Sequence, residues 1–263
     1  MVSIVFATYN ESVENLKMSI NSILGQTYRE IEFITCLEPD EKNKKLIKEL
    51  IQQHSHVIIE SDKRLGLTRS LNTSIEKAKG RFIARMDSDD IWEKDKLEKQ
   101  VSFLKKYQFD AVGCDVKLID KNSNKIGTRN YSNNSVKDNF LFQNGICHPS
   151  ILLKRSLFEE FGCYDEKFER SEDLELWLRL ISNKVSFGYV PKILMSYRVR
   201  ESYSRDSKNW KFNLKARQRY VFKIYRVHQS ILSLIVISSI YFLSCIGFMK
   251  LYDRLYQKIT LND

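Results

Sequence analysis

Apolar segments of two kinds alternate along the first hundred residues, and this alternation constrains the fold more than any other feature. A continuous apolar run at 2–7 is followed by Val13, Leu16, Ile20 and Ile23, which recur at helical spacing. Further strands are predicted at residues 31–36, 57–59 and 81–86, and a helical pattern follows each of them. Strands that alternate with helices predict an α/β fold, with a mostly parallel, Rossmann-like central sheet covered by helices on both faces.

The second half of the chain is less regular. Its predicted elements are strands at 111–119, 151–153, 185–190 and 193–197, a helix at 171–181 and a polar loop at 122–134. Ligands of parallel sheets sit beyond the carboxyl ends of the strands. Tyr9, Glu38 and residues 87–89 follow predicted strands, so we expect them to meet at one cleft.

The composition excludes global disorder and allows one sizeable domain with an appendage. Of 263 residues 43% are hydrophobic, and the formal net charge is +10. This basic balance predicts an anionic partner, such as phosphorylated small molecules or an anionic membrane surface. Binding to nucleic acid ranks last, because charge alone supports it. Five scattered cysteines without a CxxC pair predict a reducing compartment and no structural zinc site.

A basic segment followed by an uncharged one distinguishes the C-terminal part. Seven basic residues and no acidic residue occur at 208–226, and residues 231–249 carry no charge. We predict a catalytic domain at 1–204 and a basic helical tail at 205–263, attached to the cytoplasmic face of the cell membrane. The apolar segment could span the membrane, lie in its interface or form a core helix, and membrane contact is favoured. Deleting the chain after Asp206 is expected to release a soluble domain.

Two carboxylates separated by one residue follow the fourth predicted strand. Asp87 and Asp89 should point the same way, because side chains alternate between the two faces of an extended backbone. Paired carboxylates suit a hard cation such as Mg²⁺ or Mn²⁺, which can neutralise charge on a departing diphosphate. The alternative is that Asp89 or Asp90 caps a helix that begins near Trp92.

Polar residues near the other predicted strand ends are further candidates. Tyr9 could stack on a nucleobase and Glu38 could accept a hydrogen bond from one, although packing and surface charge are the ordinary alternatives. Arg64 precedes Gly66 in a loop and could meet phosphates or lie in a solvated turn.

Two further candidates lie in the second half of the chain. Glu172 and Asp173 begin a predicted helix, where they could cap it or act as a general base. His148 is interpreted as structural, with metal ligation as the lesser alternative.

Taken together, these ordered motifs resemble glycosyltransferase family 2, whose fold is GT-A. The opening SIVFATYNE at 3–11 is similar to the family's donor-binding start. The stretches RLGL at 64–67 and AKGRFIARMDSDD at 78–90 follow the family pattern. SEDLELWLRL at 171–180 resembles the acceptor-side acidic motif, and the Tyr197-Arg198 pair also fits.

The resemblance implies a role for each matching residue. Contacts to the donor nucleotide are expected from Thr8, Tyr9, Glu11, Glu38, Arg64, Asp87 and Ser88. Asp89 would be the main metal ligand, with Asp87 beside it, and Asp173 the base of an inverting single displacement. Residues expected on the acceptor side are Glu172, Trp177 and His148. Such hexosyl- or hexosaminyltransferases use nucleotide sugars, most often UDP-linked, and need Mn²⁺ or Mg²⁺.

The segment 84–90 and the HPS sequence at 148–150 also resemble a bacterial subgroup that builds capsule and exopolysaccharide. The implied acceptor is a saccharide or a lipid-linked saccharide in surface polysaccharide synthesis. One departure from the family is CLEPD at 36–40, where the family commonly has Asp-Asp-Gly-Ser, so Glu38 is the expected substitute for reading the base.

Two other functions remain as alternatives. A metal-dependent nucleotidyltransferase should carry a glycine-rich basic loop after its first strand, and residues 7–12 contain neither glycine nor a basic residue. A non-catalytic sugar-nucleotide binder or membrane scaffold would tolerate Asp173→Asn without loss.

Overall fold

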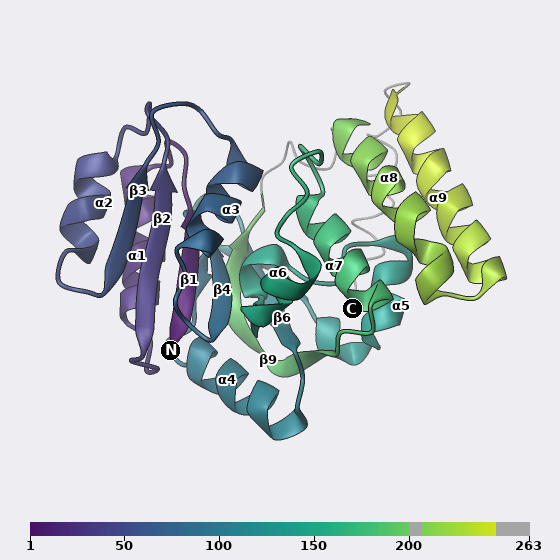
Figure 1. Cartoon of the computed structure of the whole chain (residues 1–263), viewed down its shortest axis with the longest axis horizontal. Helices are drawn as coiled ribbons and strands as arrows, with labels where there is room; N and C mark the ends of the chain where they lie inside the picture. The colour runs from purple at the N-terminus through teal and green to yellow at the C-terminus, as the bar shows by residue number, and fades with distance from the viewer. Residues whose placement is uncertain (200–206, 246–263) are drawn as a thin grey trace.

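The computed structural model describes residues 1–199 and 207–245 (Figure 1). Within these residues, nine strands form one sheet in the order β3-β2-β1-β4-β8-β6-β9-β5, and β7 pairs with β6. The strands are β1 Val2–Ala7, β2 Ile31–Leu37, β3 His56–Glu60, β4 Phe82–Asp87, β5 Ile91–Trp92, β6 Ala111–Ile119, β7 Lys125–Arg129, β8 Leu152–Lys154 and β9 Phe187–Arg198. The predicted α/β class is confirmed.

The first half of the sheet is parallel, as the sequence predicts. β1 lies between β2 and β4 and pairs in parallel with both, and β2 pairs in parallel with β3. Val2, Ile4, Val5 and Phe6 of β1 are all almost fully buried. A strand buried on both faces reads as a continuous apolar run, which is why these strands can be found from the sequence.

The second half of the sheet is mixed. β8 runs antiparallel to both β4 and β6, whereas β6 and β9 are parallel. β5 is antiparallel to β9, and its two residues follow the aspartate-rich segment directly. The long strand β9 therefore brings the C-terminal half of the chain to the loop after β4.

Two predictions for this half are wrong. The supposed loop at 122–134 contains β7 and a 3₁₀ turn at Tyr131–Asn133, because pairing with β6 holds its polar residues in a hairpin. The two strands predicted at 185–190 and 193–197 are the single strand β9, whose pairing register shifts near Pro191. Pro191 cannot donate to the ladder, which makes one irregular strand look like two.

The helices cover both faces of the sheet, and α8 and α9 pack side by side at one end of the molecule (Figure 1). Ser12 caps α1 by accepting a hydrogen bond from the Asn15 N–H at 3.2 Å. The helices are α1 Val13–Leu24, α2 Lys44–Ile51, α3 Leu67–Glu76, α4 Lys96–Tyr107, α5 Val136–Phe142, α6 Ser156–Phe161, α7 Glu172–Ser182, α8 Ser207–Ile224 and α9 Val227–Cys245. A second 3₁₀ turn spans His148–Ser150.

The basic helix α8 packs on the catalytic half instead of standing apart from it. It contacts α7, and α9 contacts both α8 and α5. Arg217, expected within a basic cluster facing a membrane, is fully buried and donates to three carbonyl oxygens, those of Phe140, Leu141 and Gln143. The predicted boundary at residue 204 and the end of the apolar segment, 246–249, lie outside the described residues.

Candidate active site

The site begins where β1 and β4 end side by side. Ala7 is the register partner of Asp87, and the Ser88 N–H donates to the Ala7 carbonyl at 3.1 Å. Ser19 of α1 donates its hydroxyl to the Asp87 carbonyl at 2.8 Å. These bonds fix the backbone after β4, so the predicted donor segment at 8–9 lies next to the predicted metal segment at 87–89.

Three carboxylates gather in that segment. Asp87, Asp89 and Asp90 each offer an oxygen, and these oxygens lie within 4.8 Å of one another. Asp89 and Asp90 are buried and Asp87 is partly exposed. An all-oxygen donor set of this kind fits a hard divalent cation such as Mg²⁺ or Mn²⁺.

The alternative role for these aspartates as helix caps is wrong. α4 begins at Lys96, not near Trp92, and its N-cap residue is Asp95. Between the aspartates and the helix the chain forms β5 and pairs with β9. The carboxylates are therefore not used by a helix and remain at the strand end.

Arg198, at the end of β9, fixes the segment that contains Asp89 and Asp90. Its backbone N–H donates to Asp90 Oδ1 at 2.8 Å, and its Nε donates to the Asp89 carbonyl at 3.0 Å. Its Nη1 donates to the Asp120 carbonyl at 2.6 Å. The other oxygen of Asp90, Oδ2, is buried without a hydrogen-bond partner, as expected of an atom that awaits a cation or a ligand.

The acidic cluster raises the pKa of one of its own members. Burial, followed by the carboxylates of Asp87 and Asp89, raises the pKa of Asp90 well above its usual range. The hydrogen bond from the Arg198 N–H and the positive charge of Arg85 lower the pKa of Asp90, and the buried Arg85 guanidinium also pairs with Asp87 Oδ2. Sequence reasoning missed this arginine as a site residue, although it precedes Asp87 by two positions and so shares its side of the strand.

On the donor side, Tyr9 and Arg64 are brought together. The Tyr9 ring is partly exposed, and the Arg64 guanidinium lies 4.7 Å from the centroid of this ring. The Tyr9 hydroxyl donates to Asp40 Oδ2 at 2.7 Å. Thr8, between Tyr9 and the sheet, has a buried hydroxyl oxygen without a partner. This side of the site thus presents an aromatic face, a cation and an unused hydroxyl.

Glu38 is used to hold a loop. Its two oxygens accept hydrogen bonds from the N–H groups of Leu65 and Gly66, both at 2.8 Å, and from the Ser70 hydroxyl at 3.0 Å. Gly66 has a φ of +76°, which suits glycine, and is the N-cap residue of α3. A contact from Glu38 to a nucleobase would compete with these three hydrogen bonds. The same hydrogen bonds hold the loop that carries Arg64 in place.

Glu11 stabilises the first loop. Its Oε1 accepts from the Asn15 side-chain amide at 2.9 Å, and its backbone carbonyl accepts from Asn43 Nδ2 at 2.9 Å. These bonds tie the loop after β1 to α1 and to the start of α2. If Glu11 contacts a nucleotide, these bonds hold both its side chain and its backbone in place for that contact.

The predicted base lies at the start of α7. Asp173 is partly exposed, its Oδ1 accepts from the Leu174 N–H at 2.7 Å, and its Oδ2 accepts from Asn144 Nδ2 at 2.5 Å. Burial raises the pKa of Asp173, and the Leu174 and Asn144 donors and the charge of Arg85 lower it. Asn144 follows α5, and nothing in the sequence motif identifies it.

Glu172, next to the predicted base, is more deeply buried. Burial, followed by repulsion from Asp173, raises the pKa of Glu172 to about 8. The two neighbours therefore differ in their surroundings, because Asp173 has two hydrogen-bond donors and partial exposure and Glu172 is buried.

The remaining residues expected on the acceptor side are enclosed. His148 Nε2 lies 2.7 Å from the Tyr164 hydroxyl, and burial together with Arg85 lowers the pKa of His148 well below its usual value. The Trp177 ring packs edge-on to His148 and has no exposed surface. Trp177 thus belongs to the core beneath the site, and its expected place on the acceptor side stays a prediction.

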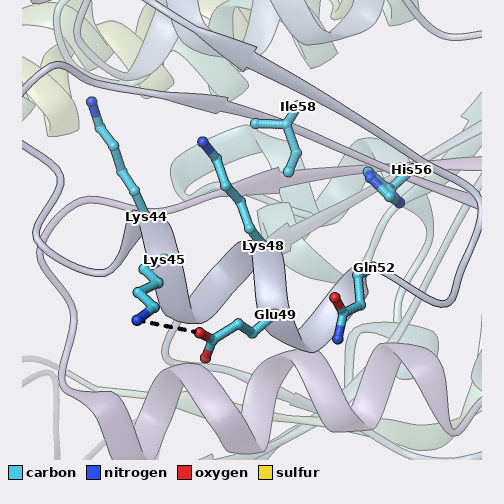
Figure 2. Close-up of a pocket in the computed structure, with 7 residues that line it drawn as sticks. All are labelled: Lys44, Lys45, Lys48, Glu49, Gln52, His56 and Ile58. Atoms are coloured by element: carbon cyan, nitrogen blue, oxygen red, sulfur yellow. Dashed lines mark ion pairs between the residues drawn. The ribbon is translucent and has the colours of Figure 1, made fainter.

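A separate shallow hollow lies between α2 and β3, at the edge of the sheet. Figure 2 shows Lys44 and Lys48 on the helix facing His56 and Ile58 on the strand. None of the residues predicted for the site lines it. The candidate active site is thus defined by the strand ends and not by this hollow.

Residues 3–162 match the family model described as Glycosyl transferase family 2, which is more than half of the chain. The chain belongs to glycosyl transferase family 2. An uncharacterized glycosyltransferase of Methanocaldococcus jannaschii is 34% identical over 77% of this chain and 73% of its own length. The glucosyltransferase WfgD of Escherichia coli is 31% identical over 77% and 78%. The O-antigen biosynthesis glycosyltransferase WbnJ, also of Escherichia coli, is 29% identical over 79% and 83%.

Solved structures show the fold of this glycosyltransferase. Residues 1–349 of S. aureus TarS in complex with UDP-GlcNAc match with a TM-score of 0.73 at 15% identity, over 98% of this chain and 77% of that TarS chain. The mannosyltransferase PcManGT from Pyrobaculum calidifontis, in complex with GDP-Man and Mn²⁺, matches with a TM-score of 0.68 at 17% identity, over 91% and 73%. The predicted GT-A fold is confirmed, and family membership favours a glycosyltransferase over a nucleotidyltransferase or a scaffold.

Proposed function

We propose that this glycosyltransferase is an inverting, metal-dependent hexosyl- or hexosaminyltransferase that uses a nucleoside-diphosphate sugar, with UDP as the nucleotide. The observation that carries the proposal is the gathering of Asp87, Asp89 and Asp90 at the carboxyl end of β4. Tyr9, in the loop after β1, and Arg64, in the loop after β3, lie in contact at the same edge of the sheet. Carboxylates for a cation beside an aromatic ring and a guanidinium suit a nucleoside diphosphate.

On the donor side, Asp89 and Asp87 would hold Mn²⁺ or Mg²⁺, with the free Asp90 Oδ2 as a further oxygen. The cation, when bound, neutralises charge on the departing nucleoside diphosphate. Tyr9 offers its exposed ring to the nucleobase, and Arg64 is positioned by the loop that Glu38 holds. Thr8, Glu11 and Ser88 complete the proposed nucleotide contacts.

On the acceptor side, Asp173 is the proposed general base. The acceptor hydroxyl oxygen attacks the anomeric carbon while the bond from that carbon to the phosphate oxygen breaks. The proton of the hydroxyl passes to a carboxylate oxygen of Asp173, which Asn144 and the Leu174 N–H orient. A single displacement of this kind inverts the anomeric configuration.

The proposed acceptor is a saccharide or lipid-linked saccharide of surface polysaccharide synthesis, at the cytoplasmic face of the cell membrane. The name of WfgD, UDP-Glc:alpha-D-GlcNAc-diphosphoundecaprenol beta-1,3-glucosyltransferase, describes a lipid-linked acceptor and a UDP donor. WbnJ is named for O-antigen biosynthesis. In this chain the apolar helix α9 is long enough to contact or cross a membrane. These observations support the acceptor class and the location.

The test is a donor screen with the full-length protein in mild detergent. Release of nucleotide is measured from UDP-, GDP- and TDP-sugars, with and without Mn²⁺, and with an extract of lipid-linked saccharides as acceptor. We expect release from a UDP-sugar that depends on Mn²⁺ and falls at least about 100-fold in Asp89→Asn. The matched control is Glu159→Gln, which removes an exposed carboxylate on α6. Equal release in the presence of excess chelator would reject the metal-dependent mechanism.

A further inference from the structure

One face of helix α9 is buried against the rest of the protein. Ser230, Ser233, Ile237 and Ser244 are buried along its length. The Ser233 hydroxyl donates to the Leu141 carbonyl of α5 at 2.5 Å, and the Ser230 hydroxyl donates to the Val221 carbonyl of α8 at 3.0 Å. This side of α9 is therefore fixed to the catalytic half by direct hydrogen bonds and by packing.

The opposite face of α9 is apolar and unpartnered among the described residues. Exposed apolar side chains recur at helical spacing towards both ends of the helix, with Val227 65% and Phe242 63% accessible, and the exposed Ser238 and Ser239 lie between the two groups. The others are Ile231, Leu232, Ile235 and Leu243. An exposed apolar stripe of this length, interrupted only by small serines, marks a surface that meets another apolar phase.

The charges next to this stripe indicate that the apolar phase is a membrane. From 207 to 245 the sequence contains no Asp or Glu, and it contains seven Lys and Arg residues. Arg217 is buried, but Lys211, Lys223 and Arg226 are exposed on and just after α8, the neighbour of α9. Exposed cations beside an apolar face match an anionic bilayer surface, where headgroups and acyl chains adjoin.

A membrane-spanning α9 is incompatible with these contacts. At 19 residues the helix could span a hydrocarbon core, but spanning requires lipid or apolar protein on every side. Here α8 lies along it, and α8 carries the basic residues. Spanning would either draw those charges into the bilayer or break the Ser233–Leu141 bond and the packing of α9 on α5 and α8.

We propose that α9 lies in the plane of an anionic membrane surface, with the stripe from Val227 to Leu243 immersed and its buried face packed on α8 and α5. This inference rests on the membrane attachment in the proposed function and specifies its geometry. Both ends of α9 then remain on the cytoplasmic side.

The native Cys245 tests this topology, because it is exposed at the end of α9 whereas Cys36, Cys114 and Cys147 are buried. In a Cys163→Ser background, a membrane-impermeant maleimide is applied to spheroplasts and to inverted membrane vesicles. We expect Cys245 to react only in inverted vesicles. Reaction of Cys245 in spheroplasts would show a spanning helix and overturn the proposal. Cys245→Ser provides the background signal.

Vesicle binding tests which face is immersed. Flotation with phosphatidylglycerol vesicles is compared with flotation on phosphatidylcholine vesicles for Ile235→Asp, Phe242→Asp and the control Ile126→Asp. Ile126 is a similarly exposed apolar residue on β7. We expect the α9 variants to lose at least tenfold in binding to anionic vesicles and Ile126→Asp to bind like the wild type. Nucleotide release in detergent should stay unchanged in all three, which separates this result from a failure of the proposed function.

Two outcomes would overturn the proposal. Unchanged vesicle binding of Phe242→Asp would show that the stripe is not immersed. If sedimentation in detergent-free buffer instead shows dimers that Phe242→Asp dissociates, without an effect on vesicle binding, the stripe covers a second copy of the chain.

Discussion

At the scale of single residues, two adjacent carboxylates at the start of α7 have different surroundings. Asp173 is partly exposed and accepts two hydrogen bonds, whereas Glu172 is buried and its pKa is raised to about 8. Donors directed at the charged form of a carboxylate favour ionisation. Asp173 is therefore the member of the pair suited to accept a proton near neutral pH.

This difference predicts unequal effects of two matched substitutions. Asp173→Asn keeps the size of the side chain and removes its basicity, so kcat should fall by about 10²- to 10⁴-fold with donor affinity retained. Glu172→Gln should reduce kcat by less than tenfold. Initial rates and donor binding by calorimetry measure both parameters. Comparable losses in the two variants would contradict the assignment of the base.

Asn144 predicts a change in pH dependence. Its amide helps to lower the pKa of Asp173, so Asn144→Ala should raise that pKa. A general base works when ionised, and activity rises as the pH passes upward through its pKa. The acidic limb of kcat/KM against pH should therefore move to higher pH in Asn144→Ala. Asn183→Ala, which changes an exposed amide at the end of α7, should leave the limb in place.

At the scale of secondary-structure elements, α8 is attached through one buried guanidinium. Arg217 supplies donors to three carbonyls at and after the end of α5. Arg219, two residues later, forms a partly exposed ion pair with Asp165. Two arginines in one helix thus have very different importance for stability.

Arg217→Met should lower the free energy of unfolding by about 3 kcal/mol, because it leaves buried carbonyls without donors. Arg219→Met removes a partly exposed pair and should cost about 1 kcal/mol or less. Urea unfolding followed by circular dichroism, in detergent, compares the two. Equal costs would mean that the α5–α8 contact does not anchor the helix.

The strands that could be predicted are those with a clear apolar pattern in their own sequence. β1, β4 and β6 are largely apolar and strongly buried, and their observed limits match the prediction within one residue. β5 and β7 are short, and pairing with β9 and β6 creates them. Asp90 resembles a helix cap in the sequence, but β9 competes for the same segment and places Arg198 on it.

The site was predictable to a similar extent. The strand-end rule places residues 8–9 and 87–89 together, as the structure does. Arg198 and Asn144 come from distant parts of the chain, and only the tertiary fold brings them to Asp90 and Asp173. Long-range partners of this kind leave no local signal in one sequence.

At the scale of the whole molecule, the C-terminal helices are part of the folded body. α8 packs on α7, which carries Asp173 at its start, and Tyr220 of α8 donates its hydroxyl to Glu175 Oε1 at 2.8 Å. The boundary expected near residue 204 therefore does not separate two independent units across the α7–α8 contact.

A chain that ends at residue 206 should consequently be unstable, contrary to the expectation of a soluble domain. Removing α8 and α9 uncovers the faces of α5 and α7 and leaves Glu175 without Tyr220. We expect aggregation, or a melting temperature lower by about 10 °C or more. Thermal unfolding and size-exclusion chromatography measure this. A monodisperse truncated protein with unchanged stability would contradict the importance of the packing.

The position of Trp92 has a practical consequence. Its indole is buried two residues beyond Asp90 and donates to the Pro149 carbonyl at 3.2 Å. Manganese is paramagnetic and quenches nearby fluorophores, whereas magnesium does not. If the acidic loop binds the proposed cation, Trp92 is an intrinsic optical reporter beside it, and the difference in emission between the two ions would follow that binding in unlabelled protein.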